Sequence, residues 1–297
     1  MLKTFKLPDH FNYIGVFLTL RCNFGCEYCI NRHGDYKSVP ELTPKQWIEG
    51  LSRLETRPDL PLTLQGGEPT LYEGWKGVAD ALWRADKPLD LLTNGSFDFF
   101  KFVHYIDPRI FNREAKYSSI RFSFHPSQHD AHALATKALL LRDRGYSVGI
   151  WGLNHPACKN QNRLMKKICD TYNVDFRMKD FLGMYKGEWH GIMKYEGACS
   201  QDCNDPQFEG KVLCRTTELL INPSGDIFRC HADLYVNRHS IANILDEDLV
   251  GIGAWTECEN YGMCNPCDIK VKTNRLQEYG HTSVEIREVK VNDKDRG

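Results

Sequence analysis

Short apolar segments alternate with amphipathic ones through about the first 195 residues of the chain. Six of the apolar segments are nearly continuous runs of aliphatic, aromatic or β-branched residues. Such runs are typical of strands that are covered on both faces. The predicted strands span residues 14–20, 60–64, 89–93, 120–124, 147–151 and 174–181.

The segments between these runs have helical patterns. Thr43 is a good N-cap and is followed by Pro44, and Trp47, Ile48 and Leu51 then recur on one helical face. We predict further helices over residues 74–85, 129–144 and 159–172. Repeated strand–helix units favour a parallel α/β sheet with right-handed crossovers. Six such strands predict a partial (β/α)6 TIM-type barrel, with the chemistry in loops at the carboxyl ends of the strands.

The pattern changes after about residue 195, where helical periodicity weakens and cysteines become frequent. Residues 218–222 and 227–230 flank a turn that contains Gly225, which predicts a β-hairpin. We therefore expect three parts: a partial barrel over residues 1–195, a small cysteine-rich α+β module that binds a metal cluster over 196–275, and a C-terminal tail over 276–297.

Composition narrows the class of protein. Hydrophobic residues make up 41% and charged residues 26% of the 297 positions, as in ordinary globular proteins. The net charge of −1 gives no reason to expect a nucleic acid or an acidic membrane as a partner. No apolar run is long enough to span a membrane. Residues 11–20 lack a cleavage site and are preceded by polar residues, so we interpret them as a buried strand, not a signal peptide, and expect a cytoplasmic location.

Twelve cysteines are unusually many for this length. Because no export signal is evident, they indicate thiolate ligands for iron or zinc instead of disulfides. Cys158 and Cys169 fall beside or within a predicted helix, and we interpret them as small buried apolar residues.

The first cysteine group follows the first predicted strand. Cys22, Cys26 and Cys29 place three thiolates on one short loop, with no fourth cysteine nearby. A [4Fe–4S] cluster held entirely by protein takes four thiolates, so three leave one iron open. A zinc site is the alternative, although this spacing is not the usual paired one.

The C-x3-C-x2-C pattern, with Tyr28 before its last cysteine, resembles the signature of the radical S-adenosylmethionine (SAM) superfamily. The resemblance extends to most of residues 14–181. It implies that an element of two glycines, a glutamate and a proline after the second strand binds the amino group of SAM. Two segments, one after the third strand and one on the fourth, resemble other SAM-contacting elements more weakly. The implied cofactor-binding residues are Tyr28, Gly66, Gly67, Glu68, Pro69, Thr93, Asn94 and Ser123. Taken singly, the glycines could mark a tight turn and Tyr28 could be a packing residue.

The resemblance also implies the chemistry. SAM chelates the open iron, and one electron from the reduced cluster cleaves it to methionine and a 5′-deoxyadenosyl radical, which abstracts a hydrogen atom from a substrate. The cofactors carry the difficult chemistry, and the protein supplies geometry and exclusion of water.

A second cysteine group resembles the SPASM and twitch modules, which hold auxiliary [4Fe–4S] clusters. The C-x15-C pair of Cys214 and Cys230 encloses Gly225, and a short strand is expected around Asn243 and Ile244. The implied ligands of one complete site are Cys214, Cys230, Cys264 and Cys267, and Cys258, Cys203 and Cys199 are additional candidate metal ligands. The full SPASM run is truncated. One auxiliary cluster is the favoured interpretation, with a second, incompletely cysteine-ligated cluster and a zinc ribbon as alternatives.

The substrate and the catalytic residues stay unknown at this level. The resemblance favours a peptide of the ribosomally synthesised, post-translationally modified class (RiPP), with a sugar or other small polar metabolite as the alternative. The chain would then be an oxidoreductase or a peptide- or metabolite-modifying enzyme, served by a reductase such as flavodoxin or ferredoxin. Cys22 lies so early that we expect no leader-binding domain before it.

Two other classes of protein are alternatives to a radical SAM enzyme. A non-catalytic iron–sulfur electron carrier needs no Gly66–Pro69 element, and a zinc-binding interaction module needs no iron. Histidines 125, 129 and 132 follow the fourth strand, where they either line a substrate site or have solvated or capping roles.

Overall fold

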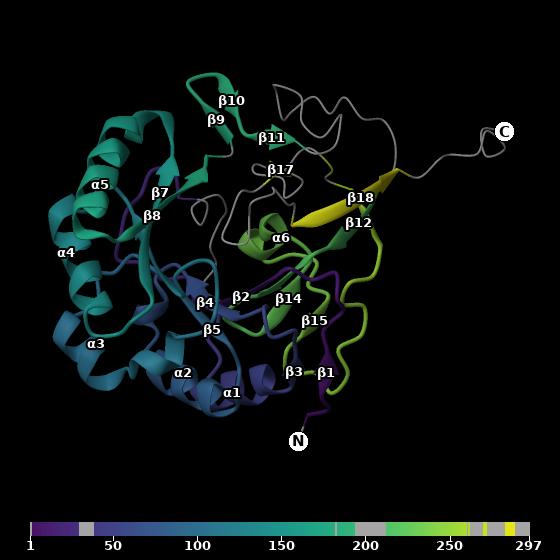
Figure 1. Cartoon of the computed structure of the whole chain (residues 1–297). Coiled ribbons are helices and arrows are strands. Elements are labelled where there is room, and N and C mark those ends of the chain that lie inside the picture. The colour runs from purple at the N-terminus through teal and green to yellow at the C-terminus, as the bar shows by residue number, and fades with distance from the viewer. Residues whose placement is uncertain are drawn as a thin grey trace, which may run out of the picture.

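Six parallel strands form the centre of the molecule, for which we use a computed structural model that describes residues 2–29, 39–181, 183–193, 212–259, 261, 270–271 and 283–288. Each of the six overlaps a strand expected from the sequence, and they lie side by side in chain order. The strands are β2 (Tyr13–Thr19), β4 (Leu62–Gly66), β5 (Leu89–Thr93), β6 (Ile120–Phe124), β7 (Val148–Asn154) and β8 (Asp175–Asp180). The predicted α/β class with a partial, unclosed parallel barrel is confirmed (Figure 1).

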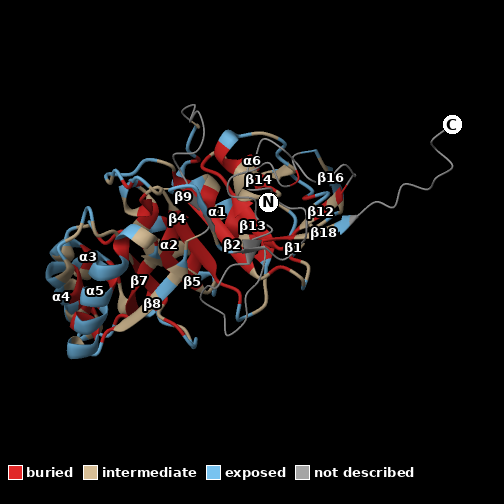
Figure 2. Ribbon diagram, turned by 90° about the horizontal axis from the view of Figure 1, so that it is seen from above, coloured by how far each residue is buried: buried red, intermediate tan, exposed pale blue. Residues whose placement is uncertain are grey.

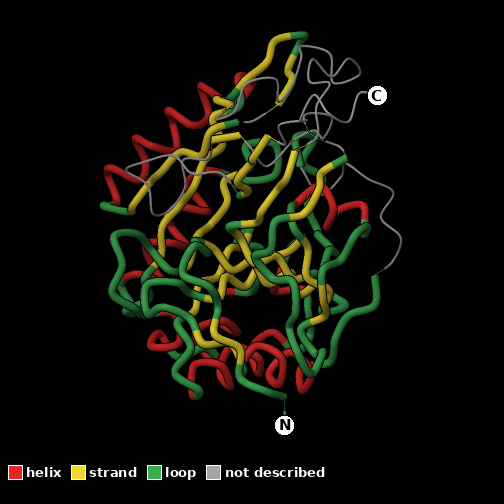
Figure 3. The backbone as a smooth tube through the Cα atoms, turned by 90° about the vertical axis from the view of Figure 1, so that its right-hand side faces the viewer, coloured by secondary structure: helices red, strands yellow, loops and turns green. Residues whose placement is uncertain are grey.

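The helices lie on the outer side of this sheet (Figures 1 and 3). The four expected helices are present as α1 (Pro44–Ser52), α2 (Trp75–Arg84), α4 (Ala131–Arg142) and α5 (Lys159–Tyr172), and α3 (Phe99–Tyr105) is an additional one. The predicted N-cap of α1 is a full capping box, because Thr43 and Gln46 each satisfy the other's backbone N–H. No helix among the described residues is long and apolar enough to cross a membrane.

Both faces of the sheet are covered, as the continuous apolar runs predict. Every residue of β2 is buried (Figure 2). Ile14 and Val16 pack in the large core that includes the outer helices, whereas Tyr13 and Phe17 point to the opposite, concave face. There they pack against α6 (His231–Val236), a helix that the sequence analysis did not predict.

The C-terminal hairpin extends the main sheet. β13 (Glu218–Ile221) pairs in parallel with β2, and β14 (Asp226–Phe228) and β15 (Ala242–Asn243) follow, so that the sheet has nine strands. Gly225 makes the hairpin turn at φ +86°, as its position in the sequence suggested. The main sheet therefore continues past the expected boundary near residue 195. The physical reason is that β13 is buried along its whole length and needs a neighbour with an apolar face.

A separate three-stranded antiparallel sheet lies beside this hairpin. Its central strand β12 (Val212–Thr216) pairs with β16 (Thr256–Cys258) on one side and β18 (Val284–Glu288) on the other. We expected residues 276–297 to form a tail, but within that range β18 pairs with β12 over five register positions.

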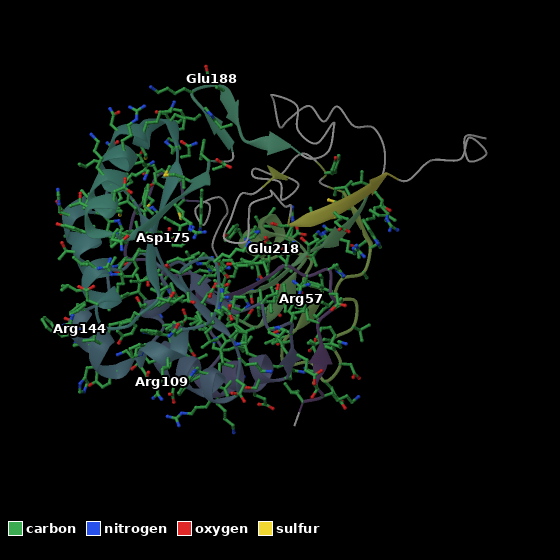
Figure 4. The ribbon with its side chains drawn as sticks, in the orientation of Figure 1. Arg57, Arg109, Arg144, Asp175, Glu188 and Glu218 are labelled. Atoms are coloured by element: carbon green, nitrogen blue, oxygen red, sulfur yellow. The ribbon has the colours of Figure 1, made fainter. Side chains whose placement is uncertain are left out.

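Shorter elements complete the described fold. β1 (Phe5–Lys6) pairs with β3 (Leu54–Glu55), and one-turn 3-10 helices occupy Pro69–Leu71, Pro108–Phe111 and Pro156–Cys158. A hairpin of β9 (Gly183–Tyr185) and β10 (Glu188–His190) rises beyond the end of β8, with Glu188 at its outer tip (Figure 4). β11 (Ile192–Met193) pairs with β17 (Lys270–Val271).

Candidate cofactor-binding site

The first cysteine group lies on the loop that leaves the carboxyl end of β2. Cys22 is exposed, Cys26 is buried and Cys29 is partly buried. The backbone N–H of Phe24 and the side-chain amide of Asn94 lie 3.4 and 3.9 Å from the sulfur of Cys22. N–H groups directed at a sulfur stabilise its thiolate form, which is the form that binds metal.

The two glycines after β4 allow that strand to approach the cysteine loop. The N–H of Gly67 donates to the carbonyl of Thr19 over 2.9 Å, and the N–H of Glu68 donates to that of Arg21 over 2.8 Å. A Cβ on Gly66 would lie 2.0 Å from the carbonyl oxygen of Thr19, and one on Gly67 would lie 2.3 Å from that of Arg21. Gly66 also adopts φ +150°. In the sequence, these glycines suggested close approach to a ligand, whereas in the fold they approach the backbone that leads to Cys22.

Glu68 connects two strand ends from a fully buried position. Its Oε1 accepts hydrogen bonds from the hydroxyls of Thr70 and Thr93, both at 2.6 Å, and from the N–H of Thr70 at 3.1 Å. Its Oε2 accepts one from the N–H of Asn94 at 2.6 Å. Burial raises the pKa of Glu68, and these donors act in the opposite direction. A carboxylate oxygen can accept two hydrogen bonds, and Oε2 accepts one among the described residues, so it has capacity for one further donor.

Asn94 joins the end of β5 to the cysteine loop. Its side-chain amide donates to Asn23 over 2.9 Å, and Asn23 in turn donates to the hydroxyl of Ser96 over 2.9 Å. The carbonyl of Asn94 lies 2.8 Å from Nε2 of His129. Asn94 thus contacts the cysteine loop, Glu68 and the segment after β6 together.

His129 is held in one tautomer by its two partners. Its Nδ1 accepts the N–H of His125 at 3.0 Å, so the ring proton lies on Nε2, where it faces the carbonyl of Asn94. Burial lowers the pKa of His129. The ring is therefore a neutral, rigid connection between the ends of β5 and β6.

Tyr28 lies against a pair of histidines. Its hydroxyl is 3.2 Å from Nδ1 of His125, and its ring centroid is 5.4 Å from that of His155. Burial lowers the pKa of His125 to about 4, with His129 and Lys179 contributing in the same direction. Burial also raises the pKa of Tyr28, so the phenol stays protonated. The ring centroids of His155 and Tyr185, which lies on the β9–β10 hairpin, are 4.5 Å apart. The sequence analysis did not predict this contact.

Most residues singled out in the sequence are thus brought to one edge of the sheet. Pro69 is buried at the start of a one-turn helix, and Ser123 lies on β6 beside Trp151 of β7. His132, by contrast, is exposed on α4. The roles of these residues in cofactor binding stay predictions.

Three cysteines of the second group lie among the described residues. Cys214 on β12, Cys258 on β16 and Cys230 just before α6 meet in one apolar cluster with Val212 and Val284. Nearby, Glu218 begins β13 beside α6 (Figure 4), and its Oε2 lies 3.8 Å from Nδ1 of His231. Cys199, Cys203, Cys264 and Cys267 lie outside the described residues.

The remaining cysteines behave as apolar residues. Cys158 and Cys169 are buried, and burial raises the pKa of both thiols, that of Cys169 to about 12. A thiol that resists ionisation is a poor metal ligand. This agrees with their interpretation from the sequence.

The donor set of the first loop fits an iron–sulfur cluster. Three thiols stand on one loop, and N–H groups face the sulfur of Cys22. Among the described residues, no three His, Cys, Asp or Glu side chains converge on a single ion. A cubane binds each thiolate through a different iron, so it does not require such convergence.

Comparisons with known proteins agree with this geometry. Residues 16–126 match the sequence profile of the Radical SAM superfamily. An S-adenosylmethionine-dependent nucleotide dehydratase of Selenomonas ruminantium is 29% identical over 84 residues, which are 28% of this chain and 30% of the relative.

Two solved structures match the chain at low sequence identity. Native anSMEcpe with bound AdoMet and Cp18Cys peptide matches with a TM-score of 0.50 and 14% identity, over 79% of this chain and 77% of that one. Streptococcus suis SuiB bound to S-adenosylmethionine matches with a TM-score of 0.47 and 16% identity, over 81% of this chain and 63% of that one. The chain therefore matches less than two thirds of the length of SuiB and of the dehydratase.

We predict that Gly67→Ala prevents normal loading of the first cluster. The added methyl group collides with the carbonyls of Arg21 and Leu20 and displaces the loop that carries Cys22. Iron content after anaerobic reconstitution should fall by at least half, with the far-ultraviolet circular dichroism spectrum retained. Gly77→Ala on α2 is the matched control, since no atom lies within 4 Å of its added methyl group. Wild-type iron content in Gly67→Ala would contradict the steric argument.

A second prediction concerns His125 and pH. Because its folded pKa is about 4 and its unfolded pKa is 6.5, the unfolded chain binds a proton first as the pH falls. Stability from this group is therefore present above pH 6.5 and is lost as the pH falls toward 4, by on the order of 3 kcal/mol.

The measurement is urea unfolding of metal-free protein across this pH range. His125→Gln should show a shallower loss of unfolding free energy than the wild type. His132→Gln, which alters an exposed histidine, should follow the wild type. Identical slopes for wild type and His125→Gln would exclude the proposed burial effect.

Proposed function

We propose that the chain is a radical SAM enzyme, which binds SAM beside a [4Fe–4S] cluster held by Cys22, Cys26 and Cys29 and removes a hydrogen atom from a peptide. The observation that supports this most directly is the contact between the cysteine loop and the Gly66–Glu68 segment. It places three thiols and a buried carboxylate at the same edge of the sheet.

The residues around this edge divide the work of binding. Cys22, Cys26 and Cys29 would hold three irons, and the fourth would be left for SAM. Oε2 of Glu68, which accepts one hydrogen bond from Asn94, would accept another from the SAM ammonium group. Thr93, Asn94 and Ser123 lie on the next strand ends and would contact the rest of SAM.

When bound, the reduced cluster and SAM together supply a 5′-deoxyadenosyl radical. The protein's own residues orient the components and exclude water. Glu68 is held by four hydrogen bonds, so its carboxylate does not need to reorganise when a cation arrives. The neutral ring of His129 fixes the loop after β5 without adding charge beside SAM.

We include an auxiliary iron–sulfur site in this proposal. Cys214, Cys230 and Cys258 already meet in one cluster of side chains. As the sequence suggested, Cys214 and Cys230 with Cys264 and Cys267 would complete a four-thiolate set, and Cys258 is an additional candidate ligand. Such a site would accept the electron that the substrate radical loses when it is oxidised, while a reductase such as flavodoxin or ferredoxin would reduce the first cluster.

A peptide is the favoured substrate class because the chain shares its fold with anSMEcpe, whose structure contains a bound peptide. A small polar metabolite is the second candidate. The local identity to a nucleotide dehydratase supports it, although that identity covers only 28% of this chain.

We expect Cys26→Ala to abolish SAM cleavage without unfolding the barrel, because the lost ligand lies on a loop and not in a strand. Formation of 5′-deoxyadenosine by reconstituted, dithionite-reduced protein should fall at least 100-fold. Cys169→Ala, which removes a buried thiol distant from the loop in sequence, should retain cleavage. Equal cleavage by Cys26→Ala and the wild type would refute the assigned ligand.

Isotope transfer tests the substrate class. Deuterium-labelled extract of the source organism, separated into peptide and small-molecule fractions, should transfer deuterium into 5′-deoxyadenosine only from the peptide fraction. Prior digestion of that fraction with a nonspecific protease should abolish the transfer. Transfer from the small-molecule fraction, unaffected by protease, would replace the peptide with a metabolite substrate.

A further inference from the structure

Arg229 lies where the three described cysteines of the second group meet. It immediately precedes Cys230, between β14 and α6, and its side chain is only 12% exposed. A buried guanidinium is costly unless its charge and its N–H groups are satisfied. The partners of Arg229 therefore indicate what this position does.

Its hydrogen bonds connect the segments that carry the cysteines. Nη1 donates to the hydroxyl of Thr256 over 3.1 Å and to the carbonyl of Glu257 over 2.8 Å. These two residues directly precede Cys258 on β16. Arg229 thereby fixes the segment of Cys258 against that of Cys230.

The third cysteine is reached through Thr256. Thr256 is the register partner of Cys214 in the β12–β16 pair, and its hydroxyl donates to the carbonyl of Cys214 over 3.4 Å. One guanidinium thus joins the backbone segments of Cys214, Cys230 and Cys258, which are far apart in the sequence.

Arg229 shares its buried acidic partner with a second arginine. Asp233, which is 2% exposed, forms ion pairs with Nη2 of Arg229 at 3.1 Å and with Nε of Arg238 at 2.7 Å. One carboxylate therefore faces two guanidinium groups. The guanidinium of Arg229 also donates to Thr256 and Glu257, so this cation lies next to the segment that carries Cys258.

One donor of this guanidinium also remains available. Nε of Arg229 is buried and has no hydrogen-bond partner among the described residues. Sulfur atoms of a cluster and its thiolate ligands accept such N–H bonds, and these bonds help to set the reduction potential.

We propose that Arg229 is a positioning residue of the auxiliary site: it holds the three cysteine segments together, and its charge raises the reduction potential of the cluster bound there. This inference rests on the auxiliary site of the proposed function. Reduction adds one negative charge to the cluster, and a nearby fixed cation stabilises that charge. The site is thereby a better electron acceptor than the same thiolates would make alone.

The two parts of this role can be separated by substitution. Arg229→Gln removes both the charge and most of the hydrogen bonds, whereas Arg229→Lys keeps the charge but cannot reproduce the planar set of donors. Arg238→Gln is the matched control, because Arg238 shares Asp233 with Arg229 but follows α6 instead of preceding Cys230.

The experiment uses the reconstituted full chain, with two readouts on the auxiliary cluster. The first is its midpoint potential, from a redox titration followed by electron paramagnetic resonance. The second is the rate at which a chelator removes its iron. Circular dichroism, together with the spectral change of the first cluster on addition of SAM, reports folding in each variant.

In Arg229→Gln, we expect a lower midpoint potential and iron release at least fivefold faster than in the wild type. Arg229→Lys should keep a near-wild-type potential but release iron faster, and Arg238→Gln should match the wild type in both readouts. If Arg229→Gln behaves as Arg238→Gln does, the inference fails while the auxiliary site stands. If wild-type protein contains iron for one cluster only, the auxiliary site fails as well, and the SAM-binding site is unaffected.

Discussion

The contact between the end of β4 and the loop after β2 determines the geometry of the candidate site. Two backbone hydrogen bonds join Gly67 and Glu68 to the carbonyls of Thr19 and Arg21. They form only because the strand has no side chain at its last two positions before Glu68. The same glycines therefore position the carboxylate of Glu68 and the loop that carries Cys22, and neither can move without the other.

A network of hydrogen bonds carries this arrangement across the neighbouring strand ends. Glu68 binds Thr93 and Asn94 at the end of β5, and Asn94 binds His129 after β6. Each partner is held through both a donor and an acceptor, so charge and tautomer are defined before any ligand arrives. Catalysis by radical chemistry needs such fixed geometry, because a reactive species must meet its substrate before it meets water.

The C-terminal part of the chain is joined to the barrel in two ways. β13 continues the main sheet beside β2, and α6 packs on the concave face against Tyr13 and Phe17. Arg53, which is buried at the C-terminus of α1, donates to the carbonyls of Ile244 and Glu247 and so ties the N-terminal half to the segment after β15. The second cysteine group is linked to the main sheet through Cys230, which lies between β14 and α6, whereas Cys214 and Cys258 lie on the separate three-stranded sheet.

The local sequence determined the elements of the barrel. The apolar runs gave the six parallel strands, Thr43 and Pro44 gave the start of α1, and Gly225 gave the hairpin turn. It also indicated a cluster-binding loop at Cys22, Cys26 and Cys29, because one short loop can bring three cysteines within eight residues together. These features depend on neighbours in the chain, and periodicity and spacing report such neighbours directly.

Only the tertiary structure decided which distant segments meet. The pairing of β13 with β2, of β18 with β12, and the contacts of Arg229 each join residues that no local pattern relates. Likewise, the need for glycine at position 67 became clear only when the carbonyl of Arg21 was found beside it. The physical reason is that a strand can pair with any other strand, and a charged side chain with any opposite charge or polar group. One chain contains many segments that meet these needs. Packing of the whole molecule selects among them.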